Sequence, residues 1–256
     1  MLGWQELTLF LYIVARVSGF ILLNPLLSRN NVPALFRAGL ILILSAFMMS
    51  LTSRTVEMPT GIIVFSIRIL AELLVGYLLG LIVHFFLYIP QLAGQIIDTQ
   101  MGMTMNQIYD AGSNSNLSVS GIFLNAMLVL LFFAANGHHT LFRILLTSDT
   151  LVPLGAVSFD STVVVNALLE LFVECTILAI KLSLPILGAE LLGQLGMGIL
   201  MKVIPQINVF SINIELKVLI GLILLLLLIA PFSEFFLQTE VRMLNSLKEM
   251  LQLVGG

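Results

Sequence analysis

The chain has 256 residues, of which 59% are hydrophobic and only 10% charged, and its mean hydropathy is +1.10. Soluble domains carry about 25% charged residues, so the composition excludes a soluble protein and indicates a single integral membrane domain over residues 1–256. A net charge of −3 without a basic cluster excludes a nucleic-acid surface, and the single Cys175 excludes an internal disulfide.

Three apolar segments in the first part of the chain predict helices. They are Leu7–Leu23, Leu40–Leu51 (helical from Pro33 onward) and Gly61–Ile89. The first segment does not begin with basic residues, because Glu6 precedes Arg16, so we expect it to be retained rather than cleaved as a signal peptide. At about 1.5 Å per residue the third helix would be about 44 Å long, beyond a hydrocarbon core of about 30 Å, so it must tilt, kink or project.

Residues 90–121 interrupt this pattern with a polar segment rich in Gly, Asn, Gln and Met and devoid of Lys and Arg. Such a segment cannot lie in hydrocarbon, where its backbone groups would lack partners, so it is an aqueous loop or it lies inside a water-lined cavity. Met101, Met103 and Met105 alternate with Gly102, Thr104 and Asn106. Met is unbranched and adapts to irregular shapes, which suits a soft seal; a chance cluster of Met residues is the alternative.

The remaining chain predicts further irregular helices. They cover Leu117–Ala135, a short helix within residues 136–150, Thr162–Met201 as two helices or one kinked at Pro185, Val218–Ala230, and an amphipathic helix over Phe232–Leu253 after a bend at Pro231. We therefore predict an all-α integral membrane protein of about six to eight irregular, kinked helices. No internal repeat is visible.

Ionisable residues inside the apolar segments indicate helix faces that contact protein or water, because each costs about 2.5 to 3.5 kcal/mol at mid-depth in lipid. They are Arg16, Arg68, Glu72, His84, Glu170, Glu174, Lys181 and Glu190. The i,i+4 spacing of Arg68 and Glu72 predicts an ion pair within one helix. Glu170, Glu174 and Lys181 share one helix face, which could line a conduit, contact a partner or, ranked last, relay protons.

Small residues predict close helix packing at two places. They are the G-x-x-x-G pair Gly76 and Gly80, and the cluster Gly193, Gly196 and Gly198.

Signatures of enzymes are missing from the sequence. It has no HExxH, GxSxG, GxGxxG or phosphate-binding Gly-rich loop, and no second membrane Asp completes a dyad with Asp110. The adjacent side chains of His138 and His139 should point apart, so we interpret them as a polar helix cap rather than metal ligands. We expect no catalysis, cofactor or metal.

Four segments resemble the FliR family, the export-gate subunits of flagellar type III secretion. They are RAGLILIL beginning at Arg37, Ala93–Met105, NGHHTLF at Asn136–Phe142 and GMGILMKVIPQINVF at Gly196–Phe210. The resemblance covers nearly the whole chain, and the NGHH element favours the flagellar branch over the related injectisomes of virulence systems. The family often has Asp-Pro in its plug loop and Arg before PQINVF, where this chain has Asp110-Ala111 and Lys202.

The resemblance implies a subunit that assembles with FliP-like and FliQ-like proteins into a helical ring, beside FlhB-like and FlhA-like proteins. This ring belongs to the flagellar basal body in the bacterial inner membrane, is raised toward the periplasm, and passes unfolded flagellar proteins along its axis. The 90–121 segment corresponds to a loop that plugs this axis. The expected plug residues are Met101, Gly102, Met103, Thr104, Met105, Asn106, Asp110 and Gly112. The expected assembly residues are Arg68, Glu72, Gly76, Gly80, Glu170, Glu174, Lys181, Pro205, Gln206 and Asn208.

Two other classes of protein remain as alternatives. A small-molecule transporter should show an internal repeat, and a passive scaffold would leave the 90–121 segment without a role. Arg29 and Arg37 make the first loop the best candidate for a cytoplasmic loop, which would place the amino terminus outside. Residues 90–121 would then also lie inside, yet they carry no positive charge, so the sequence leaves the orientation open.

Overall fold

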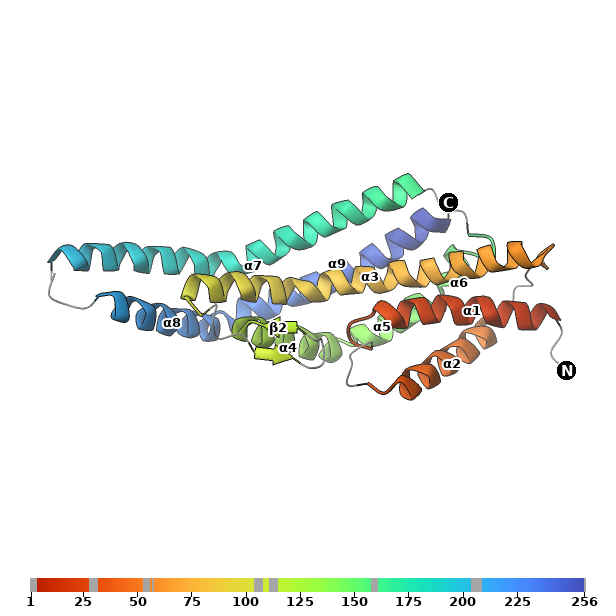
Figure 1. The fold of residues 1–256 in the computed structure, drawn as a ribbon, viewed down its shortest axis with the longest axis horizontal. Coiled ribbons are helices and arrows are strands. Elements are labelled where there is room, and N and C mark those ends of the chain that lie inside the picture. Colours follow the sequence, from red (N-terminus) through yellow and green to blue (C-terminus); the bar gives the residue numbers. More distant parts are fainter. Residues whose placement is uncertain are drawn as a thin grey trace. The chain divides into compact units, whose positions relative to one another are not determined.

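The computed structural model describes residues 4–27, 32–52, 56, 58–103, 108–110, 115–157, 161–203 and 209–255. In these ranges the chain forms nine α-helices and one pair of three-residue strands (Figure 1). The predicted all-α class is confirmed. The nine helices of the described ranges exceed the expected six to eight. One short helix was expected within residues 136–150, whereas the structure has α5 (Gly137–Leu146) there and the four-residue helix α6 over Ser148–Leu151.

The first three helices are α1 (Trp4–Leu23), α2 (Ala34–Leu51) and α3 (Ile62–Met101). Helix α3 continues through Pro90, so the prediction that a loop begins there is wrong for residues 90–101. Proline removes one backbone hydrogen bond, and the other bonds of a helix can persist around it. The apolar stripe of Ala93, Ile97 and Met101 continues at helical spacing beyond Pro90 and is fully buried, which holds the helix together.

Helix α3 ends in a tight turn at Gly102, which has a φ of 78°. The Met103 N–H donates to the Asp98 carbonyl at 2.8 Å and the Gly102 N–H to the Thr99 carbonyl at 3.2 Å. These two bonds form the Schellman motif, in which glycine supplies the left-handed conformation. The polar segment then contains an antiparallel strand pair, β1 (Ile108–Asp110) and β2 (Ser115–Leu117), which the sequence did not predict.

Six helices follow the strand pair. They are α4 (Val119–Ala134), α5 (Gly137–Leu146), α6, α7 (Ser161–Val203), α8 (Val209–Leu227) and α9 (Ile229–Gly255). Helix α7 is a single helix with Pro185 inside it, one of the two predicted forms. The predicted amphipathic helix is α9, which begins two residues before Pro231, because proline is tolerated in the first turn of a helix.

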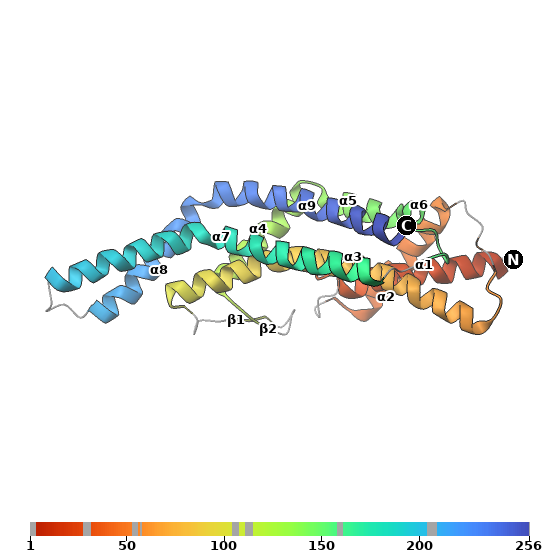
Figure 2. The same cartoon turned by 90° about the horizontal axis from the view of Figure 1, so that it is seen from above.

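The helices are organised into two compact units. The first unit comprises residues 1–86, 136–172 and 240–256, and the second comprises residues 87–135 and 173–239. In the first unit α1 packs against α2, as the two views of the ribbon show (Figures 1 and 2). Helices α3, α7 and α9 contribute residues to both units.

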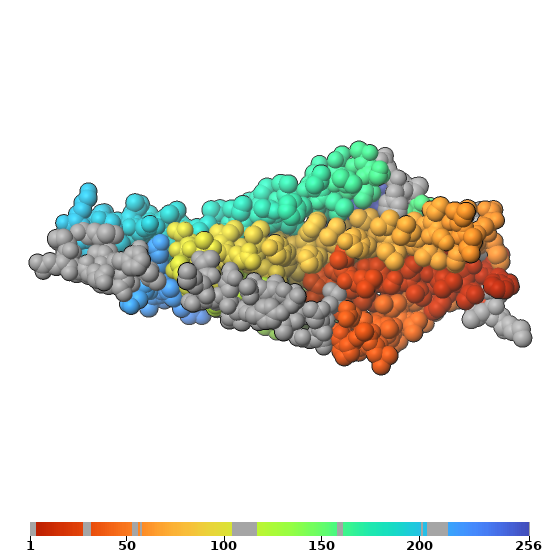
Figure 3. All heavy atoms as spheres, in the orientation of Figure 1, coloured from red at the N-terminus to blue at the C-terminus, as the bar shows by residue number. Residues whose placement is uncertain are grey.

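Several helices have the length and apolar character of membrane spans. In the described ranges these are α1, α2, α3 and α7, and two bent helix pairs raise the number from four to six. Helix α2 contributes only Ser45 and Met48 to the buried residues, and its atoms lie at the surface beside α1 (Figure 3). Apolar side chains on its exposed faces agree with the predicted membrane protein.

Candidate functional site

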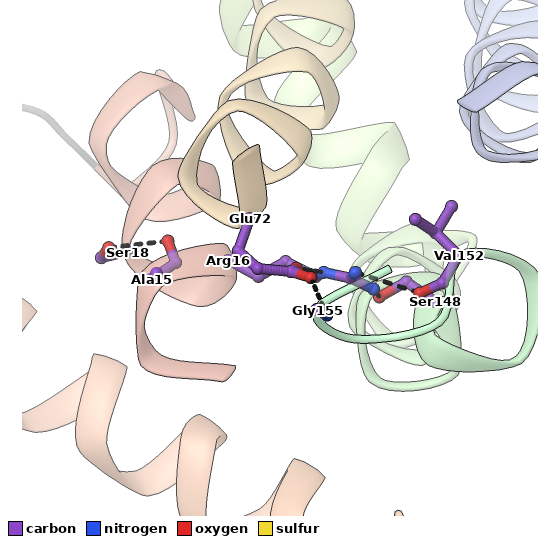
Figure 4. A network of polar contacts seen from close by, with 7 residues as sticks. All are labelled: Ala15, Arg16, Ser18, Glu72, Ser148, Val152 and Gly155. Atoms are coloured by element: carbon purple, nitrogen blue, oxygen red, sulfur yellow. Dashed lines mark hydrogen bonds and ion pairs between the residues drawn. The ribbon is translucent and has the colours of Figure 1, made fainter. Parts of the chain in front are cut away.

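Arg16 is a fully buried charge in the first unit, and Figure 4 shows its polar contacts. Its Nε donates to Glu72 Oε2 at 2.7 Å, its Nη1 to Ser148 Oγ at 3.0 Å, and its Nη2 to the Val152 carbonyl at 3.0 Å. A buried charge is tolerated only when it is paired and hydrogen-bonded, and these partners supply both conditions.

Glu72 is equally buried, and its second carboxylate oxygen accepts a hydrogen bond from the Gly155 N–H at 2.7 Å. Gly155 has a φ of 76°, and a Cβ added there would lie 2.9 Å from the Tyr12 ring. Glycine therefore meets two requirements at once, the left-handed backbone and the lack of space. The contacts of Arg16 and Glu72, which we call the Arg16 network, join α1, α3, α6 and the connection between α6 and α7.

The i,i+4 spacing of Arg68 and Glu72 allows these residues to pair, but the ion pair that the structure gives for Glu72 is with Arg16. Glu72 pairs with Arg16, which lies 56 positions away on another helix. The physical reason is burial: Glu72 is fully buried against α1, where its charge needs a partner that is equally buried.

Glycines bring α1 and α3 into backbone contact next to the Arg16 network. A Cβ on Gly76 would collide with the Arg16 carbonyl, and one on Gly19 would collide with the Leu73 carbonyl. At Gly80 the Phe20 carbonyl would lie 2.9 Å away. The predicted close approach at the G-x-x-x-G pair is present, with Gly19 as the partner that the sequence analysis missed.

The second predicted glycine cluster makes no such approach in the described part of the chain. A Cβ on Gly193 would be 3.4 Å from Ile220, and at Gly196 and Gly198 it would meet nothing within 4 Å. Among the described residues these glycines make no close backbone contact, so the close packing predicted for this cluster is not found there.

In the second unit, Asp98 joins the end of α3 to the start of α4. The Ser120 N–H lies 3.3 Å from each oxygen of the Asp98 carboxylate, which is 3% exposed. Ser118 is the N-cap of α4, and its Oγ accepts from the Gly121 N–H at 3.1 Å. Free N–H groups at a helix start need such acceptors, and a negative charge there is favourable.

Met101 occupies a notch in α8. A Cβ on Gly221 would overlap the Met101 side chain, so only glycine leaves room for it. Met101 is fully buried, and this predicted plug residue therefore packs within the second unit.

The other predicted residues have varied positions. Gly102 forms the turn after α3, Met103 is half-buried, and Asp110 pairs with Ser115 across the strands. On α7, Glu170 and Lys181 are exposed and Glu174 is half-buried. Those outside the described residues are Thr104, Met105, Asn106, Gly112, Pro205, Gln206 and Asn208.

The two histidines lie closer than predicted. The ring centroids of His138 and His139 are 4.1 Å apart at the start of α5, so the prediction that they point apart is wrong. Long side chains at the first turn of a helix can incline toward one another. In the ranges that the structure describes, no group of three or more His, Cys, Asp or Glu could hold a metal ion.

Sequence reasoning missed the partners of Arg16 and the contact of Asp98. Two of the Arg16 network's groups are the backbone atoms of Val152 and Gly155, and a backbone atom leaves no residue type to recognise. A signal for the second site was available, since Asp98 precedes the turn and Ser118 starts α4 as a typical N-cap residue.

Comparison with known proteins gives consistent matches along the chain. A sequence model of the bacterial export proteins, family 1, matches residues 7–242. The chain is 26% identical over 251 residues to the flagellar biosynthetic protein FliR of Bacillus subtilis (strain 168), covering 96% of this chain and 95% of that protein. It is 29% identical over 264 residues to FliR of Escherichia coli (strain K12), covering 99% and 97%. It is 32% identical over 199 residues to FliR of Buchnera aphidicola subsp. Baizongia pistaciae (strain Bp), covering 75% and 76%.

Proposed function

The chain belongs to family 1 of the bacterial export proteins, and we propose that it is a membrane subunit of the flagellar protein export apparatus. The observation that carries this proposal is the match over residues 7–242, together with FliR relatives that align along nearly their whole length. The apolar helices support a place in the membrane. The proposed role is transport of proteins rather than catalysis.

We further propose that the subunit assembles with FliP-like and FliQ-like proteins in the inner membrane, at the flagellar basal body, beside FlhB-like and FlhA-like proteins. Exposed charged residues on apolar α7, such as Glu170 and Lys181, support this assembly, because a partner surface or water suits them better than lipid. The injectisome counterpart is the second candidate, and the flagellar names of the relatives favour the first.

The polar segment is proposed to close the export channel at rest. A pore wide enough for an unfolded polypeptide would leak ions, and one charge crossing 100 mV is worth about 2.3 kcal/mol, so closure is a physical requirement. Helix α3 extends to Met101 and α4 begins at Val119, which narrows the proposed plug from residues 90–121 to residues 102–118. Their polar composition and lack of Lys and Arg support this role.

Deletion and complementation in the native bacterium test the export proposal. Deleting the gene should abolish secretion of flagellar filament protein and swimming, and a plasmid copy of this chain should restore both. An affinity tag on the plasmid copy should co-purify FliP-like and FliQ-like subunits from detergent. Normal secretion of filament protein in the deletion strain would refute the proposal.

A further inference from the structure

We infer that Asp98 is a positioning residue that fixes the base of the 102–118 segment by joining the end of α3 to the start of α4. The inference rests on the proposed function, because it assigns Asp98 a part in holding the plug closed. The hydrogen bonds of Asp98 do not depend on that role, so an experiment can refute the plug and still support the join between α3 and α4.

Asp98 binds the chain on both sides of the segment. Its backbone carbonyl accepts the Met103 N–H at 2.8 Å, where the chain leaves α3. Its carboxylate accepts the Ser120 N–H at 3.3 Å, where the chain enters α4. One residue thus fixes the exit and the return of the intervening chain. With 3% exposure, the carboxylate has little water to replace Ser120 if that contact is lost.

A backbone contact one helical turn away reinforces this join. A Cβ added to Gly94 would collide with the N and Cα atoms of Gly121, so α3 and α4 approach as closely as glycine allows. Gly121 also donates to the N-cap hydroxyl of Ser118. Contacts of this kind resist sliding of one helix along the other, because any side chain moved into the gap would clash.

The contacts of Asp98 with Ser120 and of Gly94 with Gly121 hold the end of α3 against the start of α4. If residues 102–118 move to let a polypeptide pass, α3 and α4 need not separate at Asp98. Loss of the Asp98 carboxylate should loosen the start of α4 and, through the proposed plug function of residues 102–118, raise leakage. A purely structural cap would give the first effect without the second.

The test uses the full chain in its assembled complex, with Asp98→Ala, Asp98→Asn and the neighbouring control Gln100→Ala. Hydrogen exchange at the first amides of α4 should rise about tenfold in Asp98→Ala, the effect of losing one hydrogen bond to a charged group. Asp98→Asn keeps an acceptor oxygen and should behave more like the wild type. Ion leakage through vesicles containing the complex should rise in Asp98→Ala and change little in Asp98→Asn and Gln100→Ala.

A second variant covers the case in which Asp98→Ala does not assemble. Ser120→Pro removes the donor N–H at a helix position that has no intrahelical acceptor, and Val119→Pro is its control at the first position of α4. Faster exchange and leakage should appear in Ser120→Pro alone.

Three outcomes distinguish the claims. Unchanged exchange in both Asp98→Ala and Ser120→Pro would overturn the inference. Faster exchange without leakage, while deletion of residues 104–115 does leak, would also overturn it, since Asp98 would then be only a cap. If the deletion does not leak either, the proposed plug is wrong, and faster exchange would still support the join between α3 and α4.

Discussion

The Nε of Arg16 lies 2.7 Å from the Oε2 of Glu72, and both side chains are completely buried between α1 and α3. The pair is surrounded by the hydroxyl of Ser148 and the backbone of Val152 and Gly155, so neither charge requires water. Removing one partner leaves an uncompensated buried charge, which is far more costly than the pair itself.

We therefore expect Arg16→Met or Glu72→Leu to destabilise the protein by about 3 to 5 kcal/mol. The double variant should cost less than the sum of the two, by about 0.5 to 3 kcal/mol, because both charges are then gone. Denaturant unfolding of the complex in detergent measures these values, with the exposed Glu249→Ala as control. Additive single effects would contradict the coupling.

Gly76→Ala should destabilise the interface of α1 and α3, because its Cβ would collide with the Arg16 carbonyl. The matched control is Gly188→Ala on α7, where a Cβ meets nothing within 4 Å. Since alanine favours helix over glycine by about 0.5 to 1 kcal/mol, the control should be neutral or slightly stabilising. The midpoint of thermal unfolding should fall for Gly76→Ala alone, and equal midpoints would show that the approach is looser than described.

The contact of Met101 with Gly221 predicts compensation between two substitutions. Gly221→Ala should destabilise because its Cβ overlaps Met101, and Met101→Ala should cost about 2 to 5 kcal/mol by leaving a cavity. In the double variant the new methyl enters the vacated space, so the combined loss should be smaller than the sum. Unfolding free energies of the four proteins test this, and a combined loss equal to the sum would count against the notch.

Deleting Thr104–Ser115 should raise ion leakage while the complex still assembles, because the join at Asp98 keeps the helix ends together. Leakage from vesicles measures the effect. A deletion within residues 151–161 is an unsuitable control, since Val152 and Gly155 belong to the Arg16 network. Replacement of residues 28–31 by Gly and Ser serves instead, and equal leakage from both variants would refute the plug.

The double change Gln206→Ala with Asn208→Ala should reduce assembly. Both residues lie in the sequence between α7 and α8, outside the described ranges, and their amides can bond free helix ends of neighbouring subunits. The yield of the co-purified complex and swimming motility measure the effect. A normal yield with normal motility would show that these two amides make no essential contact.

Local signals in the sequence predicted most helices but few contacts. Helix α2 begins directly after Pro33, as expected, since proline favours a helix start. Proline failed as a signal for the end of a helix at Pro90, where the buried stripe through Ala93 and Ile97 outweighs one lost hydrogen bond. Glu72 showed the other limit: its nearest basic residue in sequence is Arg68, whereas its partner comes from another helix. Such pairing depends on helix packing, which no local pattern encodes.

The division of the chain into units has a consequence for biosynthesis. The first unit includes residues 1–86, yet it also needs residues 240–256. Leu251 and Val254 are buried, and a Cβ on Gly255 would collide with the Leu151 carbonyl, so this late segment is an integral part of that unit's core. A nascent chain therefore lacks part of the core of the first unit, the segment that contacts Leu151, until the end of α9 emerges from the ribosome. Folding of the first unit is completed only after α9 has been translated.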